Sequence, residues 1–278
     1  MNDSRDKIED FIVAVENKIR AELRKRCEVL APDFLNPAIF TVLLALLARQ
    51  ATLTIELARA PQLWNGHSAP LFLRAMADLH ITFSWIAVEP EIRAKQYIEH
   101  GLGQAVLMQE HRKANIDNAS DEDKEAIQKV IDFDETWINI QKFTFLVDVN
   151  VGAWSGKNTR VMAEEAGILD FYNNVYVPFS QCAHNTWHHV GRYNSHPSDS
   201  PLNRLLWKPI IFDQHPDVWE LHLLSKYLDK TFNVFDKRIM NGDEKSNIHD
   251  WIYQEIQNSL VEKVNGTPEQ QEKKASEA

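Results

Sequence analysis

The sequence predicts an all-α protein, folded as a single bundle of about eight to nine helices and ending in a disordered tail. Glycine supplies only 9 of the 278 residues, whereas sandwiches, barrels and propellers need it at many turns with positive φ. Apolar residues instead recur at spacings of three and four along most of the chain, which is the period of an amphipathic helix. With 44% hydrophobic residues, the chain can bury a proper core.

Prolines and capping residues mark the first two helices. The first is amphipathic and is expected over residues 4–30. Asn36 is the expected N-cap of the second, and Pro37 occupies its first helical position. This second helix should run to residue 60, and it is apolar almost all round over residues 39–48. Such a helix is typical of the centre of a bundle.

The next three helices also have clear starts. Ser68 precedes the third, which should end at the step before Pro90, and Pro90 itself opens the fourth. Ser120 is followed by three acidic residues, which favour the positive end of a helix dipole, so the fifth helix should begin there. Residues 143–157 lose the helical period and are expected to form a connecting segment.

The second half of the chain alternates short helices and loops. Residues 195–216 contain four prolines and should be loop-rich, while residues 265–278 carry no apolar residue larger than alanine and should be disordered. One helical domain is expected over residues 1–264. The further helices are expected over residues 159–166, 170–193, 217–240 and 248–264.

Composition narrows the class of protein. The net charge of −10 argues against a broad nucleic-acid surface, which needs a basic face. Cys27 and Cys182 cannot make a disulfide framework or a four-ligand zinc site. The N-terminal residues lack the apolar core of a signal peptide, and the apolar stretch 37–48 is shorter than a bilayer requires. We therefore expect a cytoplasmic protein that does not act at a membrane.

Two charged residues on the third helix form the first candidate site. Arg74 and Asp78 are four residues apart, so their side chains share one face of a helix that is otherwise strongly apolar. A buried charge costs several kcal/mol unless it is paired. The pair is therefore either an internal lock that fixes helix register or part of a functional site.

A row of polar residues forms the second candidate site. Tyr172, Tyr176, Ser180, His184 and His188 follow one another at intervals of four. Four of the 11 histidines lie between His184 and His196, which is a high local density. The sequence leaves three interpretations of this row open.

The first interpretation is a metal site, since His184 and His188 at i and i+4 suit a divalent ion. Asp78 or Glu99 would have to complete it, and no cofactor is otherwise expected. The second is structural, with the row serving only to pack and to satisfy buried polar groups.

The third interpretation is cleavage of RNA without metal. In that case His184 is the general acid or base, Arg74 binds the phosphate, and Asp78 and Ser180 orient them. The spacing from Arg74 to His80 resembles the Arg–His pattern of the helical HEPN superfamily, whose members cleave RNA in this way.

Several motifs together resemble the bacterial family called domain of unknown function 5677. They are the Arg74-x-x-x-Asp78 helix ending in Trp85-Ile, a helix with Arg93 and Tyr97, the stretch Arg160-Val-Met-Ala-Glu-Glu-Ala-Gly167, and Tyr172-x-x-x-Tyr176-x-x-x-Ser180-x-x-x-His184. The resemblance covers about residues 35–200. It implies a helical fold that brings the Arg-x-x-x-acid pair towards the Ser-x-x-x-His pair.

The resemblance transfers no settled activity, although family members resemble accessory or antiphage-defence proteins. Asp78 replaces the usual Glu, and Val177 stands where the family often has Arg. We therefore expect a module that binds a partner protein, a second copy of itself or a small ligand. RNA is a partner only under the ribonuclease alternative.

Overall fold

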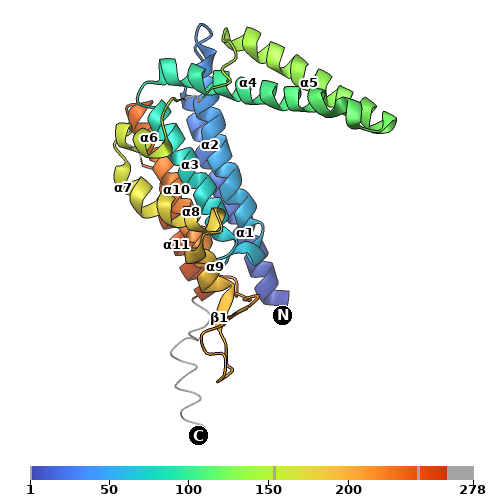
Figure 1. The fold of residues 1–278 in the computed structure, drawn as a ribbon. Helices are drawn as coiled ribbons and strands as arrows, with labels where there is room; N and C mark the ends of the chain where they lie inside the picture. The colour runs from blue at the N-terminus through green and yellow to red at the C-terminus, as the bar shows by residue number, and fades with distance from the viewer. Residues whose placement is uncertain (1, 153–154, 243–244, 262–278) are drawn as a thin grey trace. The chain divides into compact units, whose positions relative to one another are not determined.

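The computed structural model describes residues 2–152, 155–242 and 245–261 and confirms the all-α fold (Figure 1). The predicted tail, residues 265–278, lies outside the described residues. The helices and strands are α1 (Asn2–Val29), α2 (Pro37–Ala58), η1 (Pro61–Leu63), α3 (Ala69–Ile86), α4 (Pro90–Asn115), η2 (Ile116–Asn118), α5 (Asp121–Phe145), α6 (Thr159–Glu165), α7 (Leu169–Phe171), η3 (Tyr172–Tyr176), α8 (Val177–Ala183), α9 (Trp187–Tyr193), β1 (Ser195–Pro197), β2 (Trp207–Pro209), α10 (Val218–Arg238), α11 (Ile248–Glu255) and η4 (Ile256–Val261).

Local capping explains why several helices begin and end where the sequence predicts. The Ser120 hydroxyl accepts a hydrogen bond of 3.2 Å from the Asp123 amide and caps α5. The Asp217 carboxylate accepts one of 3.0 Å from the amide of Trp219 and caps α10. Gly167 adopts a φ of +74° directly after α6, a conformation that glycine reaches without strain.

The single helix predicted over residues 170–193 is wrong. The chain there forms α7, a π-helical turn (η3), α8 and α9 in succession. Pro178 has no N–H for the carbonyl one turn earlier and its ring clashes with that carbonyl, so the backbone widens into the π-helical turn before it. Asn185 then adopts a φ of +50° and separates α8 from α9. The row of residues at i, i+4 is therefore broken.

The chain divides into two compact units. Unit 1 contains the described residues of Met1–Glu28, Leu47–His80 and Asp170–Ala278, and unit 2 contains those of Val29–Leu46 and Ile81–Leu169. Helices α2 and α3 contribute residues to both units. The single domain expected over residues 1–264 stays a prediction.

Unit 1 is a layer of long helices around an apolar core. Helix α10 supplies a continuous buried stripe, and α1 and α3 face the same core with residues at helical spacing (Figure 1). The fully buried side chains on these helices include Val15, Ile19, Leu73, Met76, Leu224, Leu228, Phe232 and Phe235. The predicted loop that follows α9 carries a short antiparallel hairpin, in which Ser195 of β1 pairs with Pro209 of β2.

A buried hydrogen-bond network joins three of these helices. The Gln50 side-chain amide donates to the Thr231 hydroxyl over 2.8 Å and to the Met76 carbonyl over 3.1 Å. Nδ1 of His80 lies 2.9 Å from the same hydroxyl. Burial, followed by repulsion from Lys230 and Arg238, lowers the pKa of His80 to about 3. His80 is therefore neutral in the folded protein at any ordinary pH.

We expect His80 to make the protein sensitive to acid. The unfolded chain binds a proton at His80 below about pH 6.5, whereas the folded chain does not until about pH 3. Stability should therefore fall as pH decreases through this window, by about 1.4 kcal/mol per pH unit for one proton. Urea unfolding between pH 7 and 4.5 measures this slope, which His80→Asn should flatten. His215→Asn changes an exposed histidine and should leave the slope unchanged; an equal slope in all three proteins would contradict the prediction.

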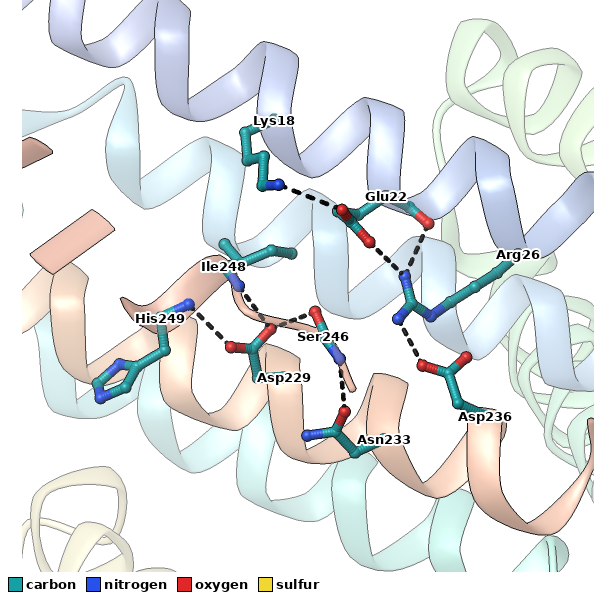
Figure 2. Close-up of polar contacts among 9 residues, drawn as sticks. All are labelled: Lys18, Glu22, Arg26, Asp229, Asn233, Asp236, Ser246, Ile248 and His249. Atoms are coloured by element: carbon teal, nitrogen blue, oxygen red, sulfur yellow. Dashed lines mark hydrogen bonds and ion pairs between the residues drawn. The ribbon is translucent and has the colours of Figure 1, made fainter. Parts of the chain in front are cut away.

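Two further polar groups of unit 1 lie in the core (Figure 2). Arg26 of α1 forms ion pairs with Glu22 on the same helix and with Asp236 on α10. Asp229 of α10 accepts hydrogen bonds from the Ser246 hydroxyl and from the amides of Ile248 and His249, which begin α11. Asp236 thus connects α10 to α1, and Asp229 connects α10 to α11.

Unit 2 is built around the antiparallel pair α4 and α5 (Figure 1). Ile131 and Ile138 of α5 are buried, and the Gln109 amide of α4 donates to the Ile131 carbonyl over 3.1 Å. The loop after α5 passes close to α4 at Gly103, where an added Cβ would lie 1.8 Å from the Asn150 carbonyl oxygen. Any side chain larger than glycine at position 103 would displace this loop.

One helix of the described part, α2, is long and apolar enough to cross a membrane by length and composition. Its best window has a mean hydropathy of 1.8, and half of that window is buried inside the protein. The core helix of a soluble protein can be equally long and equally apolar.

Candidate functional site

Arg74 connects α3 to α8 within unit 1. Its Nε donates to the Ser180 hydroxyl over 2.8 Å, its Nη2 donates to the Tyr176 hydroxyl over 2.5 Å, and its Nη1 forms an ion pair with Asp78. The Arg74 side chain is 11% exposed, while that of Asp78 is 49% exposed. The structure therefore brings Arg74 and Asp78 of the first candidate site together with Tyr176 and Ser180 of the second.

Aromatic rings surround this arginine. The guanidinium carbon of Arg74 lies 3.7 Å from the centroid of the Tyr176 ring, which is within cation–π distance. Tyr176 in turn stacks on Tyr172, with centroids 4.9 Å apart. The Ser180 hydroxyl donates to the Tyr176 carbonyl over 2.7 Å. Because these groups bond to one another, the Arg74 cluster (Arg74, Asp78, Tyr176, Ser180) fixes α8 on α3.

His184 does not join the Arg74 cluster. It follows the last residue of α8, its side chain is exposed, and no hydrogen bond, ion pair or ring contact among the described residues connects it to Arg74. His188 lies on the next helix, α9, beyond the break at Asn185. The two histidines predicted as metal ligands are therefore on different helices.

The described residues contain no group of three or more His, Cys, Asp and Glu side chains arranged to hold a metal ion. The metal site suggested for His184 and His188 stays a prediction.

The spacing of Arg74 and His80 also does not produce a joint site. Nδ1 of His80 faces the buried Thr231 hydroxyl, and its ring packs 4.6 Å from that of Phe171. A separation of six residues places two side chains on different faces of an α-helix. Arg74 faces α8 instead.

A pocket of about 160 Å³ lies beside the Arg74 cluster, within unit 1. Pro70, one helical turn before Arg74, forms part of its wall, and so do the neighbours of Ser180 on α8. Helix α9 supplies the remaining side. The residues that line it are Gly66, Pro70, Pro178, Phe179, Gln181, Cys182, His188, His189, Arg192 and Tyr193.

The charge of this pocket is opposite to that of the protein. Among the described residues its lining includes one arginine and two histidines and no aspartate or glutamate, although the chain as a whole has a net charge of −10. Gln181 and Tyr193 add further hydrogen-bond donors. The α9 pocket, defined by the lining residues above, is therefore suited to an anion.

Two more histidine contacts shape this pocket. The His67 ring lies 6.1 Å from that of His189 and 5.3 Å from that of Tyr193. Burial lowers the pKa of His189, and the neighbouring His67 and His188 lower it further. Burial also raises the pKa of the Cys182 thiol, whose Sγ–H donates to the His67 carbonyl over 3.6 Å. Both shifts favour the neutral form, that is, the thiol of Cys182 and the uncharged imidazole of His189.

Sequence reasoning did not find the α9 pocket. The high density of histidines was a signal, and His188 and His189 stand four and three residues before Arg192, a spacing that places them near one another on a helix. The sequence, however, predicted one continuous helix over residues 170–193. That prediction placed α9 on the same axis as α8, so the grouping of His188, His189 and Arg192 in a pocket was missed.

The other motif residues meet in unit 2. The Trp85 indole N–H donates to Glu165 Oε2 over 2.7 Å, and Arg93 lies 3.9 Å from the Trp85 ring centroid while donating to the Trp85 carbonyl over 2.7 Å. Lys157 pairs with the same Glu165 carboxylate. Trp85, Arg93 and Glu165 thus hold α3, α4 and α6 together. The motif residues among them therefore have a structural role.

The fold, the Arg74 cluster and the contacts of Trp85, Arg93 and Glu165 define a helical protein with buried polar residues. A family model described as a family of unknown function, DUF5677, matches residues 40–201. Because this match covers more than half of the chain, the protein belongs to that family, as the motifs predicted. No curated protein and no solved structure matches it.

We expect Arg74→Met to lower the free energy of unfolding by about 1–3 kcal/mol, because two charge-assisted hydrogen bonds are lost, one to Ser180 of α8 and one to Tyr176 of η3. Asp78→Asn is the matched control: that carboxylate is half exposed, so its loss should cost less than about 1 kcal/mol. Urea unfolding measures both. Equal costs would mean that the ion pair, rather than the contact with α8, carries the stabilisation.

Proposed function

We propose that the protein is a ligand-binding module that holds a small anionic group, a phosphate or a carboxylate, in the α9 pocket. The observation that supports this most directly is the lining of the pocket, which gathers Arg192, His188 and His189 and includes no acidic residue among those described. A proposed role as an accessory module in bacterial defence rests on the family resemblance alone.

The chemistry of the lining suits an anion better than a neutral ligand. Arg192 offers several N–H donors in a planar fork that matches the oxygens of phosphate or carboxylate. His188 stands one turn before it on α9, so both donors can reach one group. Pro70, Pro178 and Phe179 supply apolar parts of the lining.

The proposal is tested by isothermal titration of the full chain with inorganic phosphate and, separately, with acetate at low ionic strength. We expect saturable binding of one anion per chain, weakened at least about tenfold by Arg192→Gln. Arg204→Gln removes an exposed arginine of the β1–β2 connection and should leave the affinity unchanged.

Two results would overturn the proposal. One is the absence of saturable binding of either anion to the wild-type chain. The other is an equal loss of affinity in Arg192→Gln and Arg204→Gln, which would show that only the overall charge matters. Melting temperatures of all three proteins, expected to agree, exclude a folding defect in the variants.

A second candidate function is metal-independent cleavage of RNA, because His188, His189 and Arg192 line the same pocket. Neutral His189 would accept the proton of a ribose 2′-hydroxyl as its oxygen attacks the adjacent phosphorus. His188 would give a proton to the 5′-oxygen as its bond to phosphorus breaks, and Arg192 would pair with the phosphate. These roles replace those predicted for His184 and Arg74, which no described contact brings together.

Incubation with single-stranded RNA, with and without a chelator, separates the two functions. Cleavage that persists in chelator and is lost in His189→Gln supports the ribonuclease. Intact RNA alongside saturable phosphate binding supports the binding module. Cleavage that is lost in chelator would overturn both and revive the metal interpretation.

We also propose a protein partner or a second copy for unit 2. Val130, Phe133, Trp137 and Ile140 of α5 are all exposed and follow a spacing of three and four residues, which forms an apolar stripe on a different face from the buried Ile131 and Ile138. Sedimentation of the wild type and of Trp137→Glu tests the second copy: a dimer that the variant abolishes supports it, and a monomeric wild type excludes it.

A further inference from the structure

Trp187, the first residue of α9, is 70% exposed although it is the largest apolar side chain of that helix. Single exposed apolar residues are common on proteins and need no explanation. What distinguishes Trp187 is its neighbour one turn later, Gly191, and its position next to the α9 pocket.

The Trp187 indole lies flat over Gly191. A Cβ built on Gly191 would meet Cε2 of the indole at 2.9 Å and two of the three atoms bonded to it, Cδ2 and Cζ2, both at 3.3 Å. Equal distances to the two bonded neighbours are possible only if the Cβ stands above the ring face, since an approach in the ring plane would leave one neighbour much farther away. One face of the indole therefore covers the helix backbone, and its exposure comes from the opposite face and the edges.

The faces of α9 place this indole beside the pocket. Residues at i and i+4 share a face, and the next residue along is rotated by about 100°. Trp187 and Gly191 form one face, His188 and Arg192 the next, and His189 and Tyr193 the one after. The last two faces line the pocket, so the indole borders it on the side of His188 and Arg192.

The size of the pocket requires most of a larger ligand to remain outside. Pockets that enclose a whole small molecule usually measure about 300–1,000 Å³, whereas this one measures about 160 Å³. It can hold a phosphate group and exclude the remainder. Along α9, the surface next to His188 and Arg192 is the open face of Trp187, on which that remainder can lie.

We propose that the ligand is a nucleotide, with its phosphate in the α9 pocket and its base stacked on Trp187. The inference rests on the proposed anion-binding function and adds the class of molecule that carries the anion. An indole held flat by a glycine is a preformed stacking surface, so it loses little conformational freedom when a base binds. Stacking tolerates every base, because each has a π-face.

The test compares ligands that differ only in the base. The full chain is titrated calorimetrically with inorganic phosphate, ribose 5-phosphate, AMP, GMP, CMP and UMP. We expect at least one nucleoside monophosphate to bind about tenfold or more tightly than ribose 5-phosphate, which is the lower range for one base stacked on an aromatic side chain.

Gly191→Ala is the decisive variant. Its methyl group would collide with the indole at 2.9 Å and push the ring off the helix, while alanine itself favours the helical backbone over glycine. The advantage of the nucleotide over ribose 5-phosphate should disappear, and the affinity for ribose 5-phosphate should stay the same. Trp187→Ala should act in the same way, and Trp187→Phe should retain part of the advantage.

The outcomes separate this inference from the proposed function. Binding of phosphate and ribose 5-phosphate without any gain from a base overturns the nucleotide and leaves the anion site standing. A gain that survives in both Gly191→Ala and Trp187→Ala also overturns it, because the base then lies elsewhere. Failure of every ligand to bind overturns the anion site and the inference together.

Discussion

Arg26→Ala is expected to lower the free energy of unfolding by about 3–5 kcal/mol, because it leaves the partly buried Asp236 carboxylate without its cation and leaves Glu22 with Lys18 alone. Arg26 is 6% exposed. Its Nη2 donates to Asp236 over 2.5 Å, its Nη1 donates to Glu22 over 3.0 Å, and its guanidinium carbon lies 4.3 Å from the Phe232 ring centroid (Figure 2). One substitution therefore removes a cation–π contact and both ion pairs of Arg26, and it leaves the Asp236 charge unbalanced in the contact of α1 with α10.

The effect of Arg26→Ala should diminish in acid. Burial raises the pKa of Asp236, and the hydrogen bond from Arg26 opposes this rise. Without Arg26 the pKa of Asp236 rises further, so the carboxyl is protonated, and its buried charge removed, at a higher pH in the variant. The difference between wild type and variant should narrow as pH falls from 7 to 4.5.

Arg59→Ala is the control for Arg26, measured by urea unfolding at each pH. Arg59 also pairs with a glutamate, Glu16, but its side chain is 45% exposed. Its loss should cost less than about 1 kcal/mol. If the two alanine variants proved equally stable, the buried pair would contribute no more than an exposed one, and this account of the α1–α10 contact would be wrong.

Asp229→Ala is expected to cost about 2–4 kcal/mol, because it leaves three donors at the start of α11 without an acceptor. The Asp229 carboxylate accepts from the His249 amide over 2.8 Å, from the Ile248 amide over 3.2 Å and from the Ser246 hydroxyl (Figure 2). Burial raises the pKa of Asp229, and these hydrogen bonds oppose it. The side chain thus caps α11 from another helix.

Asp229→Asn and Asp217→Ala are the controls for this prediction. Asp229→Asn keeps one acceptor oxygen and should fall between wild type and Asp229→Ala. Asp217 caps α10 from an exposed position through one hydrogen bond, so its loss should cost about 1 kcal/mol. Hydrogen exchange should show faster opening of α11 in Asp229→Ala only; unchanged exchange there would contradict a capping role.

The parts of the fold that local chemistry determines could be predicted from the sequence. Ser120 begins α5 as expected, Asp217 lies where the helix over residues 217–240 was expected to begin, and Arg74 pairs with Asp78 because four residues make about one helical turn. The contact of Arg74 with Ser180, 106 residues apart, followed only from the family resemblance. No periodicity in the sequence indicates which distant side chain completes a buried pair.

The α9 pocket could not be predicted, because its walls come from three separate segments of the chain. Pro70, Cys182 and Arg192 become neighbours only after the backbone turns at Asn185, which adopts a φ of +50°. An i, i+4 row of residues suggested a straight helix instead and grouped His184 with Ser180. Because Asn185 is left-handed, His188 and His189 lie on α9 and not on a continuation of the α8 face that carries Ser180.

The central claim is that the α9 pocket binds an anion through Arg192, His188 and His189, and nuclear magnetic resonance of the histidine rings tests it most directly. During a titration with inorganic phosphate, the ring signals of His188 and His189 should shift together and saturate with one dissociation constant, while that of His215, an exposed histidine outside the pocket, stays in place. In Arg192→Gln the same shifts should need at least about tenfold more phosphate. Ring signals of His188 and His189 that do not saturate, or that move no more than that of His215, would contradict the claim.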